Sequence, residues 1–249
     1  MTKSRGKKTK TILFDLDGTL LPMDQEKFTK RYFELLAEKM SAYGYDKKQL
    51  VTSVWEGTAA MVRNDGTKSN EKAFWHKFAE IYGKEALADQ PLFDAFYERE
   101  FQGARAFCGF DLIAVETVKK IKKMGLRLIL ATNPIFPKTA TEFRIHWAGL
   151  EPSDFEFIAA YENSRYCKPN PKYYNEILSK LNLQPEECLM VGNDVTEDMV
   201  ARKIGMNVFL LTDCLINKER EDINQYPRGS FEQLLNYIEK AIKGESQNE

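Results

Sequence analysis

Short apolar runs that alternate with helix-like segments are the feature of this 249-residue chain that most restricts its fold. Strands that are apolar on both faces and separated by helices are typical of a parallel sheet covered on both sides. The pattern therefore predicts an α/β fold. The runs that we expect to form buried strands are Thr11–Phe14, Leu126–Ala131, Phe155–Ala160, Cys188–Val191 and Val208–Leu211.

Capping residues locate the helices between these runs. Asp111 precedes a segment with apolar residues at helical spacing, and Gly125 follows that segment, so we expect a capped helix between them. By the same reasoning, further helices are expected over residues 137–147, 171–181, 195–205 and 231–242.

The segment from residue 22 to about residue 105 does not follow this rhythm, because it contains helix-like stretches and almost no strand signal. We interpret its many aromatic residues as the core of a small helical bundle rather than as a surface that stacks on a ligand. The helix-like stretches are Gln25–Tyr43, Lys47–Arg63, Asn70–Tyr82 and Lys84–Phe101, and the aromatic residues are Phe28, Tyr32, Phe33, Trp55, Phe74, Trp75, Phe78, Phe93, Phe96 and Tyr97.

The length of the chain exceeds the usual domain size of about 100–150 residues, which agrees with a second domain. We predict one α/β core domain formed by residues 1–21 and 106–249, interrupted by a helical domain over residues 22–105. The hinges between the two domains are expected at residues 21–23 and 103–109.

The charge, hydropathy and cysteine content of the chain exclude several classes of function and location. A net charge of -1 provides no overall field that would attract nucleic acid or an anionic membrane. No apolar run approaches the roughly 18 residues of a membrane span, and the run after the basic N-terminus is too short for a secretory signal. The four cysteines are far apart and are expected to be free thiols. We therefore expect a cytoplasmic protein with no nucleic-acid partner and no membrane partner.

Polar residues follow the predicted strands at the edge where ligands gather in a parallel sheet. Several carboxylates at this edge would repel one another unless a cation neutralised them, and hard oxygen ligands of this kind suit Mg²⁺. The residues expected to meet there are Asp15, Asp17, Thr132, Asn133, Lys168, Asn193 and Asp194.

Each of these side chains suits one part of a phosphoryl-transfer site. Asp15 and Asp17 are two positions apart, so one carboxyl can act as nucleophile and the other as general acid and base, provided that their environments differ. Thr132 supplies a hydroxyl donor. Lys168 supplies a positive charge that would hold Asp15 ionised and offset phosphoryl oxygens.

Four motifs in order resemble those of the haloacid dehalogenase (HAD) superfamily of phosphatases and phosphotransferases. The first is the D-x-D-G-T motif, the second an apolar strand that ends in Ser or Thr, the third a Lys followed by Pro-x-Pro, and the fourth an acidic pair after an apolar strand. They stand here as Asp15-Leu16-Asp17-Gly18-Thr19, Leu128-Ile129-Leu130-Ala131-Thr132-Asn133, Lys168-Pro169-Asn170-Pro171 and Val191-Gly192-Asn193-Asp194.

The resemblance implies a Rossmann-like core, with the helical insertion as a C1-type cap, and it implies a mechanism. Asp15 would attack phosphorus to give an aspartyl-phosphate, and Asp17 would protonate the leaving oxygen and then activate water. Thr132 and Lys168 would bind the phosphoryl group, together with Asn133, mainly through its backbone. Mg²⁺ would be held by Asp15, the carbonyl of Asp17 and an acidic residue of the fourth motif.

The fourth motif departs from the family pattern, in which Gly-Asp is followed by a second Asp four or five positions later. Here Asn193 stands between Gly192 and Asp194. We assign the metal ligand to Asp194, since a carboxylate offsets the charge of the metal better than an amide. Asp198 has two open interpretations: a hydrogen bond to a metal-bound water or to Lys168, or a favourable interaction with a helix dipole.

The resulting prediction is a Mg²⁺-dependent hydrolase of a small phosphorylated metabolite, acting as a monomer or weak dimer. Asp17 argues against the dehalogenases and the phosphonate-cleaving branch, which lack an acid/base Asp there. A sugar phosphomutase of the same family is the enzymatic alternative, and a non-catalytic regulatory protein is the alternative from another class. Arg63 is expected either to recognise a second anionic group or to lie in a solvated turn.

Overall fold

A computed structural model describes residues 8–243 of the chain. Its sheet has six parallel strands in the order β3-β2-β1-β4-β5-β6, so the α/β fold class predicted from the sequence is confirmed. The strands are β1 (Thr11–Phe14), β2 (Arg127–Leu130), β3 (Phe157–Ile158), β4 (Cys188–Gly192), β5 (Asn207–Leu211) and β6 (Arg228–Gly229).

The helices fall into a group inserted after β1 and a group that packs on the sheet. The inserted α-helices are α1 (Gln25–Ser41), α2 (Lys47–Val62), α3 (Asn70–Tyr82) and α4 (Gln90–Glu98), accompanied by the 3₁₀ helices η1 (Lys84–Asp89) and η2 (Glu100–Phe107). The helices of the core are α5 (Leu112–Lys123), α6 (Lys138–Trp147), α7 (Pro171–Lys180) and α8 (Phe231–Lys243), and its 3₁₀ helices are η3 (Pro152–Asp154), η4 (Pro185–Glu187), η5 (Met199–Ile204) and η6 (Ile223–Gln225).

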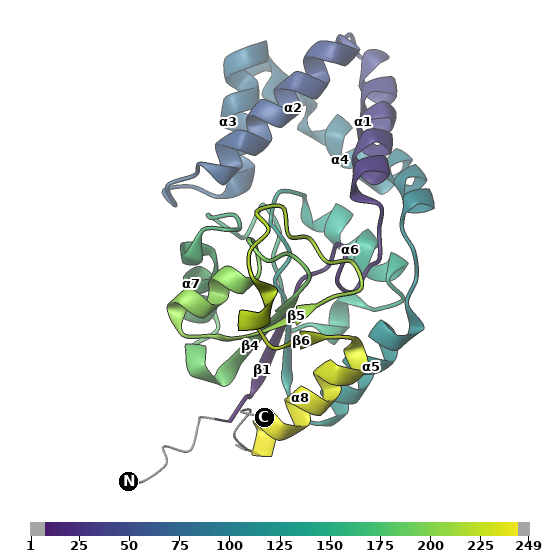
Figure 1. Ribbon diagram of the computed structural model, residues 1–249. Helices are drawn as coiled ribbons and strands as arrows, with labels where there is room; N and C mark the ends of the chain where they lie inside the picture. The colour runs from purple at the N-terminus through teal and green to yellow at the C-terminus, as the bar shows by residue number, and fades with distance from the viewer. Residues whose placement is uncertain (1–7, 244–249) are drawn as a thin grey trace.

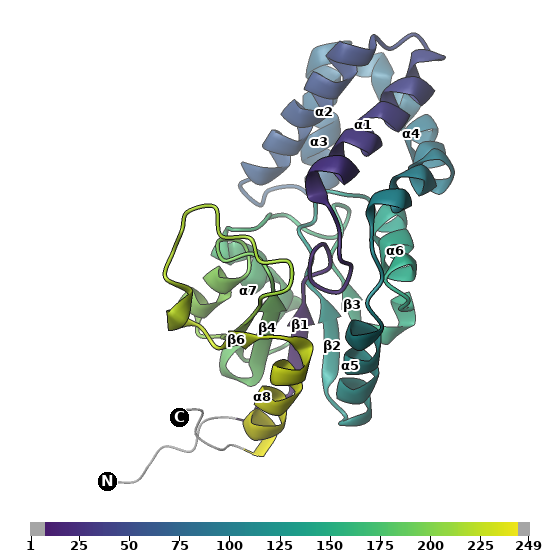
Figure 2. The same ribbon diagram turned by 45° about the vertical axis from the view of Figure 1, so that its right-hand side comes forward.

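Side chains of the strands alternate between two apolar clusters, one on each face of the sheet. In β1, Ile12 and Phe14 belong to one cluster and Leu13 to the other, and all three are fully buried. Helices α5 and α6 cover one face and α7 covers the other (Figure 2). Burial on both faces explains why the strands appear in the sequence as continuous apolar runs.

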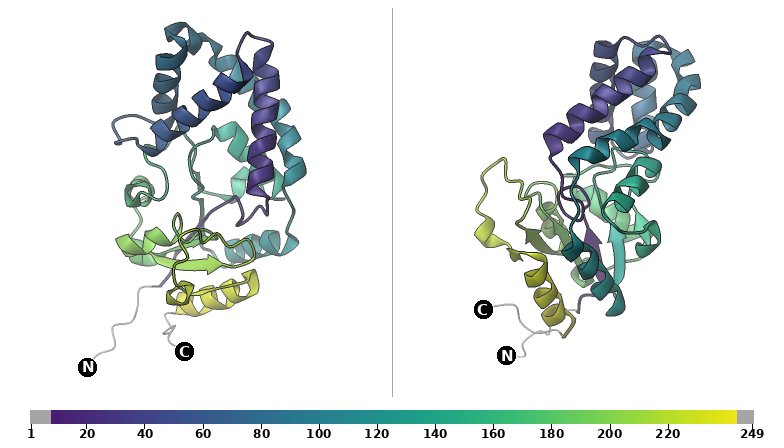
Figure 3. Two further views of the ribbon diagram at one scale, coloured as in Figure 1. Left: turned by 45° about the horizontal axis from the view of Figure 1, so that its top comes forward. Right: turned by 90° about the vertical axis from the view of Figure 1, so that its right-hand side faces the viewer.

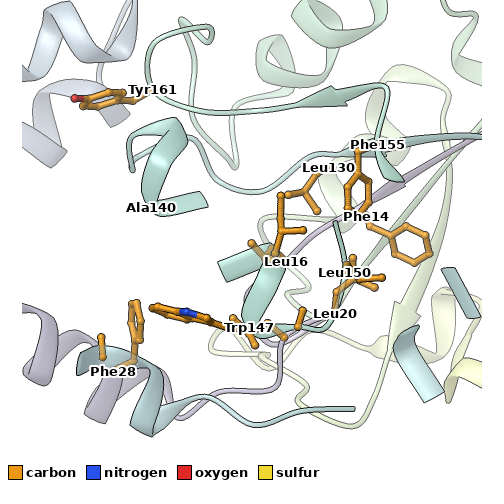
Figure 4. Close-up of a cluster of buried hydrophobic side chains, with 14 of the residues drawn as sticks. Phe14, Leu16, Leu20, Phe28, Leu130, Ala140, Trp147, Leu150, Phe155 and Tyr161 are labelled. Atoms are coloured by element: carbon orange, nitrogen blue, oxygen red, sulfur yellow. The ribbon is translucent and has the colours of Figure 1, made fainter. Parts of the chain in front are cut away.

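The larger cluster connects the sheet with the inserted helices. Figure 4 shows part of it, with Phe14 and Leu130 on neighbouring strands and Trp147 on α6. The ring of Phe101 stacks on Trp147 at a centroid distance of 5.2 Å and meets Phe28 of α1 edge-on at 6.1 Å. The inserted helices are therefore packed onto the core.

The inserted helices form a cap that stands over one end of the sheet, the end at which β1 delivers Asp15 (Figure 1). Two linkers join the cap to the core, and both rise from the same end of the core (Figure 3). They pair with each other, since Met23 and Cys108 form an antiparallel bridge and the N–H of Gly109 donates to the Pro22 carbonyl at 2.6 Å.

Two predicted helices differ from the structure, and one strand of the sheet was not predicted. The helix predicted over Lys84–Phe101 is divided, because Pro91 has no N–H to donate and so favours a new start at α4. The segment 195–205 forms a turn followed by the 3₁₀ helix η5 rather than a continuous α-helix, and the side chain of Asp194 accepts the backbone N–H groups of Thr196 and Glu197 at the start of that turn. The sequence also gave no signal for β6, which has two residues and no apolar run.

Two expectations about cysteines and membranes can be compared with the structure. Cys108, Cys167, Cys188 and Cys214 are all free thiols. Over residues 8–243, none of the helices combines the length and apolar character that crossing a bilayer requires.

Candidate active site

The first motif lies at the end of β1. The backbone N–H of Asp15 donates to the Val191 carbonyl at 2.9 Å, so the main chain extends the sheet by one residue before it turns. Gly18 has φ +85°, and a Cβ there would lie 2.4 Å from Nδ2 of Asn193. Both the backbone conformation and the lack of space therefore require glycine at this turn.

The carboxylate of Asp15 is held by a lysine and a hydroxyl. Nζ of Lys168 lies 2.8 Å from Oδ1 of Asp15 and 2.6 Å from Oδ1 of Asp198, and the Lys168 side chain is fully buried. The hydroxyl of Thr19 lies 3.2 Å from the other Asp15 oxygen. Burial lowers the pKa of Lys168, but the carboxylates of Asp15 and Asp198 more than compensate and raise that pKa well above its usual value. The ammonium therefore remains charged.

Asp17 has a different environment, which is dominated by Arg144. The guanidinium of Arg144 donates from Nη1 to Oδ2 of Asp17, and Arg144 is 1% exposed. Oδ1 of Asp17 is buried and has no hydrogen-bond partner among the described residues. Burial raises the pKa of Asp17, and Arg144 opposes this shift. Asp15 and Asp17 thus have separate counterions, as a division into nucleophile and acid/base requires.

Sequence reasoning missed Arg144, although α6 contains a signal for it. Arg144 is a charged residue on the face of α6 that also carries the buried residues Ala140 and Thr141. A guanidinium on an apolar helix face needs partners. It finds them in the Asp17 carboxylate, the Ala140 carbonyl at 3.3 Å, the Thr141 hydroxyl at 3.3 Å and the Phe136 ring, whose centroid lies 4.5 Å from Cζ.

Thr132 and Asn133 follow β2 and border the same cavity as Asp15. Thr132 is 2% exposed, and its carbonyl accepts a hydrogen bond from the Tyr173 hydroxyl at 2.7 Å. The side chain of Asn133 accepts from the backbone N–H of Lys168 at 3.3 Å and donates to the carboxylate of Glu197 at 3.1 Å. Asn133 therefore connects the loop after β2 with the two loops that carry Lys168 and Glu197. Glu197 was not among the site residues predicted from the sequence.

Asn193 and Asp194 of the fourth motif, and Asp198 after it, make different contacts. Asn193 is buried, and its side chain accepts from the Thr19 hydroxyl at 2.9 Å and donates to the Cys214 carbonyl at 2.6 Å. Asp194 uses Oδ1 to accept two backbone N–H groups. Asp198 bonds Lys168 and the backbone N–H of Asp194, and its side chain makes no helix-capping hydrogen bond. Of the two interpretations of Asp198, the contact with Lys168 is the one present.

The donor chemistry of this cavity fits a hard divalent cation. Asp15, Asp17 and Asp194, which carry carboxylates, all border it. Over residues 8–243, no cluster of three or more acidic, histidine or cysteine side chains is arranged around a single point. Mg²⁺ does not need such a cluster, because it commonly binds one or two carboxylates, keeps several waters and shares a substrate phosphate.

The cavity has a volume of about 240 Å³ and lies between the cap and the carboxyl ends of the strands. Its core side carries Asp15, Asp17, Thr132, Asn133 and Asp194, so the structure brings these predicted site residues together, with Lys168 buried behind Asp15. Arg63 is exposed and does not border this cavity.

Several aromatic residues that we interpreted as bundle core also border the cavity, so that interpretation was incomplete. Phe78 and Phe96 are fully buried and belong to the core alone. The aromatic cavity residues on the cap are Phe28, Tyr32, Phe33, Trp55, Phe74, Trp75, Phe93 and Tyr97.

One cap residue is bonded directly to the loops of the site. Asn70, at the start of α3, is fully buried. Its Nδ2 lies 3.2 Å from the Pro134 carbonyl, 3.3 Å from the Tyr166 carbonyl and 3.3 Å from the Cys167 sulfur. These partners flank Asn133 and Lys168, so Asn70 joins the cap to both of the loops expected to bind phosphate.

A parallel, Rossmann-like α/β core with a helical cap, paired aspartates and a buried lysine at the strand ends defines a class of capped hydrolases with an aspartate-based site. The family model of haloacid dehalogenase-like hydrolases matches residues 9–205, and the chain belongs to that family. The predicted family and the predicted enzyme class, a HAD-type phosphatase, are both confirmed.

The relatives are distant, and several of them match most of the chain. A phosphoglycolate phosphatase from Colwellia psychrerythraea is 25% identical over 89% of this chain and 92% of its own length. A HAD phosphatase structure from Thermococcus onnurineus has a TM-score of 0.57 at 17% identity, covering 92% of this chain and 98% of its own. A HAD hydrolase from Bacillus subtilis, solved with bound magnesium, has a TM-score of 0.54 at 16% identity, with coverage of 93% and 99%. At these identities, the two solved structures support the fold.

Proposed function

We propose that the protein is a Mg²⁺-dependent phosphatase that hydrolyses a small phosphomonoester through an aspartyl-phosphate. The observation that carries the proposal is the pairing of Asp15 with a buried lysine while Asp17, beside the same cavity, pairs with Arg144 and keeps one oxygen without a partner. This arrangement supplies a nucleophilic carboxyl paired with an ammonium and a second carboxyl whose pKa is raised by burial, which favours proton transfer.

The reaction has two steps, and both are nucleophilic attacks on the same phosphorus atom. In the first, a carboxylate oxygen of Asp15 bonds to phosphorus while the bond to the ester oxygen breaks, and Asp17 gives its proton to that leaving oxygen. In the second, Asp17 takes a proton from a water that attacks phosphorus, and the bond to Asp15 breaks. Lys168 and the hydroxyl of Thr132 bind the phosphoryl oxygens.

The residues that would hold Mg²⁺ are Asp15, Asp194 and the backbone carbonyl of Asp17. When bound, the ion supplies positive charge that offsets the charge of the phosphoryl group. The magnesium bound in the Bacillus subtilis structure supports this choice of metal.

The cavity also supports a small substrate. A volume of about 240 Å³ beneath a packed cap has room for a metabolite and not for a polymer. For the domain boundaries we propose residues 22–105 as the cap and residues 1–21 with 106–249 as the core, of which 1–7 and 244–249 lie outside the described residues. We further propose a cytoplasmic location, which the four free thiols support.

Release of inorganic phosphate from p-nitrophenyl phosphate and from a panel of metabolite phosphates tests the proposal. We expect activity that requires Mg²⁺, disappears with EDTA and is lost in Asp15→Asn. Asp213→Asn provides the matched control, since Asp213 is exposed and does not border the cavity.

Three other results would contradict the proposed function. Activity that is equal in Asp15→Asn would exclude Asp15 as the nucleophile, and activity that is indifferent to EDTA would exclude the metal. Conversion of one hexose phosphate isomer into another without phosphate release would identify the mutase instead.

A further inference from the structure

The cavity between cap and core has two chemically different halves. Its core half is acidic and includes Asp15, Asp17, Asp194 and Glu197. Within the described residues, the side chains that the cap contributes to the cavity include no Lys, Arg, His, Asp or Glu. Among residues 8–243, the one cation in the cavity lining is Lys218, an exposed residue of the core.

The cap half is built mainly from aromatic rings that hold one another in place, and its polar side chains apart from the tyrosines are the uncharged Gln25, Thr29 and Thr58. Trp75 and Phe93 meet edge-on at a centroid distance of 5.2 Å, and Tyr32 meets Phe136 of the core edge-on at 5.5 Å. The hydroxyls of Tyr32 and Tyr97 lie 2.9 Å apart, so these two polar groups satisfy each other. Rings fixed in this way form a preformed apolar surface, which an apolar ligand can occupy at a low entropic cost.

A tryptophan on this surface is also open to solvent. Trp55 borders the cavity and is 52% exposed, with its ring centroid 5.2 Å from that of Phe33. Ligand pockets are lined predominantly by apolar and aromatic side chains, and the exposed indole of Trp55 offers a further face on which an aromatic ring could stack.

We propose that the aromatic half of the cavity binds an uncharged leaving group that carries a ring, so that the substrate is a monophosphate ester of an apolar, ring-bearing alcohol. The proposal rests on the proposed phosphatase function and names the substrate class of the same site. The phosphoryl group would lie against Asp15, Thr132 and Lys168, and the ring against Trp75 and the other rings of the cap.

The size of the cavity agrees with this substrate class. An apolar cavity of about 150 Å³ is known to hold one benzene ring. The cavity here, about 240 Å³, therefore has room for one ring together with a phosphoryl group.

The charges of the cavity also disfavour a second anionic group on the substrate, because Lys218, the only cation in the described lining, is exposed and belongs to the core rather than to the cap. A carboxylate on the leaving group would face apolar rings and the acidic residues of the core, and no cation from the cap would pair with it. An unpaired buried charge is strongly unfavourable. Phosphoglycolate, the substrate named for the Colwellia psychrerythraea relative, carries such a carboxylate.

The test compares esters whose leaving alcohols differ in one feature at a time. We expect kcat/KM for 2-phenylethyl phosphate to exceed that for ethyl phosphate, because only the first has a ring, and to exceed that for phosphoglycolate by at least about 100-fold. Equal values for 2-phenylethyl and ethyl phosphate, or a preference for phosphoglycolate, would overturn the proposal.

Two positions on α2 provide a matched pair of charge variants. The hydroxyls of Thr58 and Thr52 each donate to a carbonyl four residues earlier, but only Thr58 borders the cavity. We expect Thr58→Lys to reduce the preference for 2-phenylethyl phosphate over phosphoglycolate by about tenfold or more, since it adds the missing cation. We expect Thr52→Lys to leave the preference unchanged. The same shift in both variants would contradict the proposal.

Binding without turnover separates this inference from the proposed function. In the Asp15→Asn background, calorimetry should detect binding of 2-phenylethanol and no binding of glycolate. Adding Trp55→Ala to this background should abolish the binding of 2-phenylethanol, whereas adding Trp55→Phe should retain it. If no ester releases phosphate but 2-phenylethanol binds in this way, the proposed function fails and the aromatic site stands. If phosphate is released but 2-phenylethanol does not bind, the aromatic site is refuted and the function stands.

Discussion

The buried pair formed by Arg144 and Asp17 allows a quantitative test of what holds the candidate acid/base in place. Arg144 is 1% exposed and cannot lose its proton, whereas the Asp17 side chain is 24% exposed and can become neutral. The two partners should therefore respond differently when the other is removed. We compare Asp17→Asn, Arg144→Met and the double variant by urea unfolding in buffer with EDTA.

Asp17→Asn keeps the shape of the side chain but leaves the Arg144 guanidinium without a counterion. Breaking a buried pair in this way costs about 3–5 kcal/mol, and the partial exposure of Asp17 favours the lower value of about 3 kcal/mol. Arg144→Met leaves a carboxyl that can take up a proton, so we expect a smaller loss of about 1–3 kcal/mol.

The double variant decides whether these losses come from the pair. With both charges removed, the free energy of unfolding should lie above that of Asp17→Asn alone, with a coupling energy of about 2–3 kcal/mol. Arg127 and Glu156 provide the control, because they form an ion pair with 37% and 44% exposed side chains, which should contribute no more than about 1 kcal/mol. If the double variant loses the sum of the two single-variant losses in unfolding free energy, within about 0.5 kcal/mol, Arg144 and Asp17 are not coupled and the reasoning is refuted.

Three further predictions concern the cap, the first motif and the buried phenols. Asn70→Ala removes the donor that the Pro134 and Tyr166 carbonyls share, so the free energy of unfolding should fall by about 1–3 kcal/mol in urea titrations; an unchanged midpoint would contradict the role given to Asn70. Gly18→Ala places a Cβ 2.4 Å from Asn193 at φ +85°, and should lower the thermal midpoint, with a backbone cost of about 1–2 kcal/mol before the clash is counted. Burial raises the pKa of Tyr32 to about 12, and that of Tyr97 well above its usual value. Above about pH 10 the unfolded chain therefore releases protons that the folded chain keeps, and stability should fall by up to about 1.4 kcal/mol per pH unit for each such tyrosine. Tyrosinate absorbance should show that these phenols ionise only as the protein unfolds. Ionisation of all tyrosines before unfolding would contradict this prediction.

The parts of the molecule that the sequence predicted well are those governed by neighbouring residues. The run Thr11–Phe14 is apolar because both of its faces are buried, and Asp15 and Asp17 follow within three positions, so strand and motif are visible together. Asp111 and Gly125 likewise mark the ends of α5 through local backbone chemistry.

The parts that it did not predict depend on partners far along the chain. Arg144 meets Asp17 across 127 positions, and Asn70 meets its three partners across 64 to 97 positions. The spacing of residues in α6 indicates that Arg144 needs a partner, but it does not identify that partner, and nothing near Asn70 in the sequence identifies its partners. The aromatic cap residues posed a related problem, because a ring that faces a cavity and a ring that faces a core share the same helical spacing. Only the arrangement of the helices separates the two roles.

The bonds made by Asn70 limit how freely the cap can change over evolution or in the laboratory. Trp75 and Phe93 border the cavity and contact each other, so exchanging them would alter the surface that the proposed leaving group meets. Asn70 instead donates hydrogen bonds to main-chain carbonyls in the two loops that would bind the phosphate. A cap transplanted from a relative would therefore need a donor at this position, whatever alcohol it was chosen to recognise.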